Sequence, residues 1–173
     1  MSAPENLEDI YTDELADLWS ANDQMEKVVR ELAKVAGPTL KKRLEKQADG
    51  IKKHTTAVKS LLKDMGEDEP EHCKGMEGLV KEARKHAIEE KIEDQDVRDV
   101  VIISQFQRMS HYGICGFGTC KAFAEALGED DHADTLDGIT ADIYGADENM
   151  TELAERSANL KAKEDEEDDD SDD

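Results

Sequence analysis

The strongest constraint on the fold is an apolar stripe that runs through residues 7–35. Apolar side chains recur there at steps of three and four for about eight helical turns. This spacing places them on one face of a helix, and Gly37-Pro38 marks the end of that helix. Comparable stripes occupy residues 39–65, 95–127 and 132–162. The pattern predicts four long amphipathic helices and favours no strand.

A shorter apolar stripe covers residues 74–91, between the second and third long helices. Four long helices with short turns predict an all-α, antiparallel four-helix bundle. The connection 66–95 is long enough to cross the bundle, so helices 39–65 and 95–127 can run parallel. We therefore expect a flexible segment 1–6, a bundle over residues 7–161 and a disordered acidic tail over residues 162–173.

The chain is strongly acidic, with 44 acidic and 22 basic residues and a net charge of −22. Residues 164–173 contain nine acids and no base, and the remaining 35 acidic and 22 basic residues leave the body at about −13. Such a body repels phosphate backbones, so direct nucleic-acid binding is not expected. A basic protein partner could bind the acidic tail, although such tails usually serve solubility.

The cysteines indicate a reducing compartment. Their number is odd, and Cys115 and Cys120 point in different directions on one helix, so no disulfide framework is expected. Both are expected to be buried, inert thiols. Residues 1–6 contain no basic region or apolar run, and no stretch is apolar enough for a membrane span. These observations predict a cytoplasmic protein.

Two segments carry a resemblance to a known family. Residues 73–79 read Cys-Lys-Gly-Met-Glu-Gly-Leu, and residues 97–119 contain Val-Arg-Asp, then Gln-Arg-Met-Ser-His-Tyr, then Gly-Phe-Gly-Thr. Leu-Trp-Ser-Ala at 18–21 and Met-Thr-Glu-Leu-Ala at 150–154 add weaker matches. Together they resemble the YciE/YciF ferritin-like family over about residues 7–157. The resemblance implies a ferritin-like bundle, an association with stress and a homodimer.

The resemblance also implies a di-iron centre, which needs glutamates and histidines facing the bundle interior. Carrying the family's ligand pattern over to this chain gives a degenerate set. Asn22 and Ser110 stand where glutamates are expected, and Lys52 stands where a histidine is expected. The full set of carried-over positions is Asn22, Asp49, Lys52, Ser110, Gly113, Gly138, Ala141 and Asp142.

This set predicts no bound cofactor, because few carboxylates remain and an ammonium group repels cations. The alternative is a pair of iron or manganese ions. If one cation binds weakly, we expect Asp49, His54 and Asp142 to hold it, although a partly buried, hydrogen-bonded His54 is the simpler expectation. The Glu-x-x-His sequences at 69–72 and 129–132 lie near turns and predict only surface charge.

Three functions remain open from the sequence. The leading interpretation is a stress-associated, non-catalytic ferritin-like protein whose metal site has degenerated. The second is a ferritin-like di-metal oxidoreductase, peroxidase or iron-handling protein, and the third is an acidic protein that binds basic partners. Gly113, Gly116 and Gly118 indicate a close helix approach, a bend or a dimer contact. His111 and Tyr112 are expected to hold their helix in place.

Overall fold

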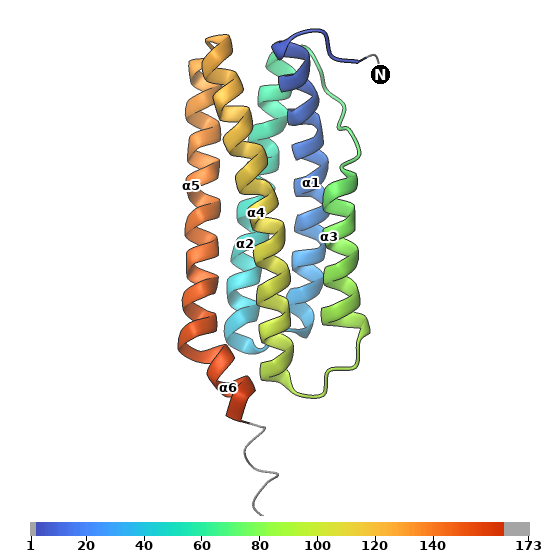
Figure 1. Ribbon diagram of the computed structural model, residues 1–173, viewed down its shortest axis with the longest axis vertical. Coiled ribbons are helices and arrows are strands. Elements are labelled where there is room, and N and C mark those ends of the chain that lie inside the picture. Colours follow the sequence, from blue (N-terminus) through green and yellow to red (C-terminus); the bar gives the residue numbers. More distant parts are fainter. Residues whose placement is uncertain (1–2, 165–173) are drawn as a thin grey trace, which may run out of the picture.

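The computed structural model describes residues 3–164, which are helical apart from short connections and contain no strand. Four long helices lie side by side along the molecule, and a shorter helix lies against them (Figure 1). The helices are α1 (Leu7–Val35), α2 (Pro38–Asp64), α3 (Lys74–Arg84), α4 (Gln95–Leu127), α5 (Asp130–Leu153) and α6 (Asn159–Glu164). Two π-helical turns follow α3 and α5, at Lys85–Glu89 and Ala154–Ala158. The predicted all-α bundle with one extra helix is confirmed.

The chain direction alternates except at one crossover. In Figure 1, α1 descends, α2 ascends, and the connection carrying α3 returns to the lower end before α4 ascends. Helices α2 and α4 are therefore parallel, as the length of the connection predicts. Helix α3 packs against α1 and α4. Among the described residues, 3–164, no helix is both long and apolar enough to cross a membrane.

Local signals fix where the helices begin and end. The Asn6 side chain accepts a hydrogen bond from the Asp9 amide at 2.9 Å, which caps α1. Asp94 caps α4 in the same way, through the Val97 amide at 2.7 Å. Proline occupies the first turn of α2, where its missing N–H costs nothing. Gly128 ends α4 with φ +80°, a left-handed conformation that favours glycine.

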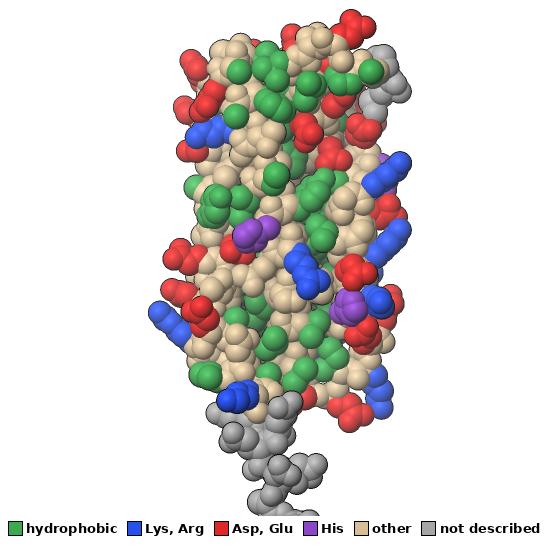
Figure 2. All heavy atoms as spheres, in the orientation of Figure 1, with side chains coloured by type: hydrophobic (Ala, Val, Ile, Leu, Met, Phe, Trp, Pro, Cys, Tyr) green, Lys and Arg blue, Asp and Glu red, His purple; other side chains and the backbone are tan. Residues whose placement is uncertain are grey.

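The buried apolar residues form two cores along the bundle axis. The lower core includes Met25, Leu44, Val80 and Phe106 and is closed on one side by α3. The upper core is formed by the other halves of the four long helices and contains Leu15, Leu62, Phe117 and Leu136. Figure 2 shows one face of the molecule, where most charged side chains lie toward the edges and apolar side chains are visible between them, together with a His and a Lys or Arg side chain near the middle.

The last helix differs from the sequence-based expectation. A continuous helix was expected over residues 132–162, whereas α5 begins at Asp130 and ends at Leu153, and α6 turns away from its axis (Figure 1). The π-helical turn between them changes the register of the buried face, so that Ala158 packs into the lower core. Residues 162–164, assigned to the tail from sequence, are helical. The rest of the predicted tail lies outside the described residues.

Candidate functional site

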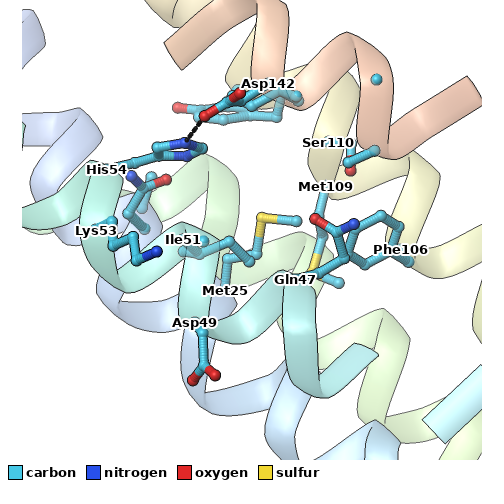
Figure 3. A pocket seen from close by; sticks show the side chains of 18 of the residues that line it. Met25, Gln47, Asp49, Ile51, Lys53, His54, Phe106, Met109, Ser110 and Asp142 are labelled. Atoms are coloured by element: carbon cyan, nitrogen blue, oxygen red, sulfur yellow. Dashed lines mark hydrogen bonds and ion pairs between the residues drawn. The ribbon is translucent and has the colours of Figure 1, made fainter. Parts of the chain in front are cut away.

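A cavity of about 510 Å³ lies midway along the bundle, where the two cores meet. Its inner wall is apolar and consists mainly of Met25, Met76, Phe106 and Met109. It opens between α2 and α5, which pack against each other much less extensively than α1 packs on α2 or α4 on α5. Figure 3 shows the side chains of both helices at this opening.

Two polar side chains inside the cavity lack a protein partner. Asn22 on α1 is 6% exposed, and Ser110 on α4 is 1% exposed. Neither Asn22 Nδ2 nor Ser110 Oγ has a hydrogen-bond partner among the described residues. A buried polar group without a partner costs about 1–3 kcal/mol, so such groups are uncommon in folded proteins. The pair gives the apolar cavity two fixed hydrogen-bonding points.

Only some of the positions carried over from the family's ligand pattern lie together at the cavity. Asn22, Ser110 and Gly113 line the inside of the cavity, and Asp49, Ala141 and Asp142 line its opening. Gly138 is exposed and lies elsewhere on α5.

The position of Lys52 contradicts the sequence-based argument that its ammonium group would repel cations from the site. It is exposed and does not line the cavity, because the neighbouring Ile51 and Thr55 occupy the buried face of α2. An interior ammonium group therefore does not oppose metal binding.

Both carboxylates at the opening already have cationic or polar partners. Asp49 is 69% exposed, and Arg30 donates to its Oδ1 at 2.9 Å. Asp142 is 75% exposed, and its Oδ2 lies 3.2 Å from Nε2 of His54 (Figure 3). The expected meeting of His54 and Asp142 is present, with His54 largely buried, but Asp49 points away from them (Figure 3).

This donor set does not fit a di-iron centre. A di-iron bundle uses a Glu from each of two helices and a Glu-x-x-His pair from each of the other two, all projecting inward. Here the inside presents an amide, a hydroxyl and a glycine, and the two aspartates lie at the exposed opening. Within residues 3–164, no group of three or more His, Cys, Asp or Glu side chains could hold a metal ion.

A polar network beside the cavity explains the Cys73 motif. The Tyr112 hydroxyl donates to Asp17 Oδ2 at 3.0 Å, and Cys73 Sγ lies 3.0 Å from the same hydroxyl. Because the tyrosine proton is directed to Asp17, the thiol donates to the tyrosine oxygen. Burial raises the pKa values of both Cys73 and Tyr112, so the two groups stay protonated. Asp17 was missed from sequence because nothing local links it to residues 73 or 112.

The same network fixes the start of α3 on α1. Cys73 Sγ accepts from the Met76 amide at 3.3 Å and caps α3, while the Cys73 amide donates to Ser20 Oγ at 3.0 Å. A Cβ at Gly75 would lie 2.8 Å from a ring carbon of Tyr112, so this position requires glycine. His111 Nε2 lies 3.2 Å from Asp147 of α5. These contacts agree with the prediction that His111 and Tyr112 hold α4 in place.

Two predictions of burial, one for a histidine and one for a cysteine, were wrong. His132 was expected to be surface charge, but it is buried, and its Nδ1 lies 2.9 Å from the Tyr11 hydroxyl. Its position falls on the inner face of α5, one turn before the buried Leu136. Cys115 was expected to be buried but is exposed, whereas Cys120 is buried. Burial raises the pKa of Cys120 to about 12.

The three glycines of α4 have different surroundings. A Cβ at Gly116 would lie 2.6 Å from Leu18 Cδ2, so α1 and α4 approach closely there. A Cβ at Gly113 would lie 3.4 Å from Ile143 Cδ1, and one at Gly118 would meet nothing within 4 Å. Of the interpretations given by the sequence, the close helix approach therefore applies at Gly116.

The fold and the central cavity define a ferritin-like helical bundle whose centre presents an amide and a hydroxyl group. Residues 6–163 match the family described as "Domain of unknown function (DUF892)", and the chain belongs to this family. It is 30% identical to Protein YciF of Escherichia coli K12 over 163 residues, which cover 91% of this chain and 95% of that protein. The resemblance to the YciE/YciF family is thus confirmed.

Solved structures give the same assignment. The crystal structure of the E. coli stress protein YciF matches with a TM-score of 0.84 and 25% identity, over 90% of this chain and 99% of that one. YcfI, a putative structural protein from Rhodopseudomonas palustris, matches with a TM-score of 0.80 and 26% identity, over 87% and 98%. Most of this chain therefore has the same fold as these proteins.

Proposed function

We propose that this chain is a stress-associated, non-catalytic member of its family, in which the bundle has a structural or interaction role and no di-metal centre forms. The observation that carries the proposal is the neutral lining of the cavity at Asn22, Ser110 and Gly113. The stress association is inferred from the relative YciF, and the structural role agrees with the description of YcfI.

Electrostatics supports the absence of paired cations. Two divalent ions at the bundle centre need several carboxylates to offset their charge in a site of low dielectric constant. Among residues 3–164, the carboxylates that line the cavity are Asp49 and Asp142, which are mostly exposed and are partnered by Arg30 and His54. Moving either inward would break its ion pair or hydrogen bond without supplying the remaining ligands.

A homodimer in the cytoplasm is part of the proposal. Helix α4 carries apolar side chains outside its buried face as well as on it. Three of them, Val101, Ile114 and Phe123, are only partly buried. Such side chains suit a contact with a second copy of the chain. Light scattering of the purified protein should give twice the chain mass of 19.3 kDa, and the mass of a monomer would contradict the proposed homodimer.

Metal analysis tests the proposal. Protein produced with added iron and manganese should contain far less than one of these ions per chain. The double variant Asn22→Asp with Ser110→Asp is the matched control, because it places two carboxylates in the same cavity. We expect Mn²⁺ to raise the thermal stability of the variant and not that of the natural chain. About two tightly bound ions per natural chain would contradict the proposal, since that is the di-iron stoichiometry.

A further inference from the structure

Residues 3–164 supply no hydrogen-bond partner for Asn22 Nδ2 or Ser110 Oγ, and both atoms are buried. We infer that the cavity binds an uncharged small molecule with an apolar body and a carbonyl or hydroxyl oxygen. This inference rests on the proposed function, because a pair of metal ions would occupy the same space.

The size and walls of the cavity suit such a molecule. Its volume of about 510 Å³ lies within the range of about 300–1,000 Å³ found for small-molecule sites. Met25, Met76 and Met109 contribute flexible thioether side chains, and Phe106 contributes an aromatic ring. Methionine adapts its shape to different apolar ligands, and sulfur packs favourably against aromatic rings. The wall therefore selects for an apolar and preferably aromatic body.

The two polar atoms define the ligand's functional group. An amide nitrogen can only donate a hydrogen bond, and a serine hydroxyl can donate or accept one. A carbonyl oxygen has two lone pairs and can accept from both groups, and a hydroxyl oxygen can satisfy the same pair. The charged side chains that line the cavity, Lys46, Asp49, Lys53 and Asp142, are all exposed at its opening. A carboxylate or ammonium group beside Asn22 and Ser110 would therefore lose its hydration without meeting a buried charge of opposite sign. The lining therefore favours a neutral ligand.

The opening between α2 and α5 provides an entry route. Gly50 on α2 and Gly145 on α5 both line the cavity, and a Cβ at either position would meet nothing within 4 Å. The backbone at Gly145 therefore accepts a Cβ without a clash, and a larger side chain there would narrow the opening. Gly138 lies two turns away on the same helix, also has open space, and does not line the cavity. The two glycines form a matched pair for a blocking experiment.

The test compares three probes of similar shape: acetophenone, isopropylbenzene and benzoate. Binding is followed by NMR of the protein labelled at its methionine methyl groups. Met25, Met76 and Met109 line the cavity, and Met65 and Met150 lie outside it and serve as internal controls. We expect acetophenone to shift the three cavity methyls saturably. Isopropylbenzene should bind about five- to tenfold more weakly because it offers no acceptor, and benzoate should not bind.

The variants separate polar recognition from simple filling of space. Asn22→Leu should lower the affinity for acetophenone to that for isopropylbenzene. Ser110→Ala should also lower the affinity for acetophenone. Gly145→Phe should abolish binding of both, and Gly138→Phe should leave it unchanged. The methyl signals of Met65 and Met150 show whether each variant keeps the fold.

Three results would overturn the inference: no saturable shift with any probe, equal affinity of the natural chain for acetophenone and isopropylbenzene, or shifts as large at Met65 and Met150 as at the cavity methyls. The titrations use protein of measured metal content. Metal-free protein that binds no probe contradicts this inference alone, whereas two bound metal ions contradict the proposed function.

Discussion

Tyr112 of α4 donates its hydroxyl proton to Asp17 of α1 at 3.0 Å, and the same oxygen lies 3.0 Å from the Cys73 thiol. One phenol thus joins two long helices and the start of α3. Tyr112→Phe removes both hydrogen bonds and leaves the Asp17 carboxylate without its donor. We expect a loss of about 1–3 kcal/mol in the free energy of unfolding, measured in urea. Tyr144→Phe changes a tyrosine that is 56% exposed on α5 and should have almost no effect.

The close approach of α1 and α4 predicts opposite effects at two glycines of the same helix. Gly116→Ala should destabilise the protein because the new Cβ would lie 2.6 Å from Leu18, which is buried and cannot withdraw freely. Gly118→Ala should stabilise it by up to about 1 kcal/mol, because the position is open and alanine favours helix. Thermal unfolding of both variants checks this. Equal effects at the two positions would show that the helices do not touch at Gly116.

The cavity predicts a stabilising substitution. Asn22→Leu replaces a buried, unpartnered amide with an apolar side chain of similar size. Without an added ligand, it should increase the free energy of unfolding by about 1–3 kcal/mol. Asn159→Leu is the control, because Asn159 is exposed on α6 and should change stability by less than about 0.5 kcal/mol. A destabilised Asn22→Leu variant would mean that the amide has a partner in solution.

Alkaline pH should destabilise the protein partly through Cys120. Burial, with smaller contributions from the negative charges of Glu14 and Asp17, raises its pKa from 9.0 to about 12. The unfolded chain therefore releases this proton first, so the stability contribution is complete below pH 9 and is lost as pH rises toward 12. Burial also raises the pKa values of Tyr11 and Tyr112, which act in the same direction.

Urea unfolding between pH 8 and 11, under reducing conditions, measures this effect. Cys120→Ala should make the decline in stability with pH shallower than in the natural chain. Cys115→Ala removes an exposed thiol and should leave the slope unchanged. A slope that is the same in all three proteins would assign the alkaline transition to other groups.

The helices were predictable because their signals are local. The apolar stripe of residues 7–35 and the Gly37-Pro38 stop are visible in the sequence, and the length of connection 66–95 suggested the parallel pair α2 and α4. The end of α5 was not predictable in this way. Its π-helical turn depends on how Ala158 meets the lower core, which is a tertiary contact.

The site was only partly predictable because it depends on helix rotation and on distant partners. The ligand pattern implied by the family resemblance placed Lys52 at a ligand position, but the rotation of α2 exposes Lys52 and buries Ile51. Asp17 and Cys73 meet at Tyr112 although they are far apart in sequence. His132 near the start of α5 resembled surface charge until Tyr11 was seen beside it.

The central claim is that neutral groups replace metal ligands at the bundle centre. A crystal structure of protein soaked with Fe²⁺ or Mn²⁺, with anomalous diffraction data at the metal's absorption edge, tests it most directly. We predict no anomalous peak inside the cavity beside Asn22 and Ser110. Two strong peaks there, coordinated by side chains from the long helices, would contradict the account.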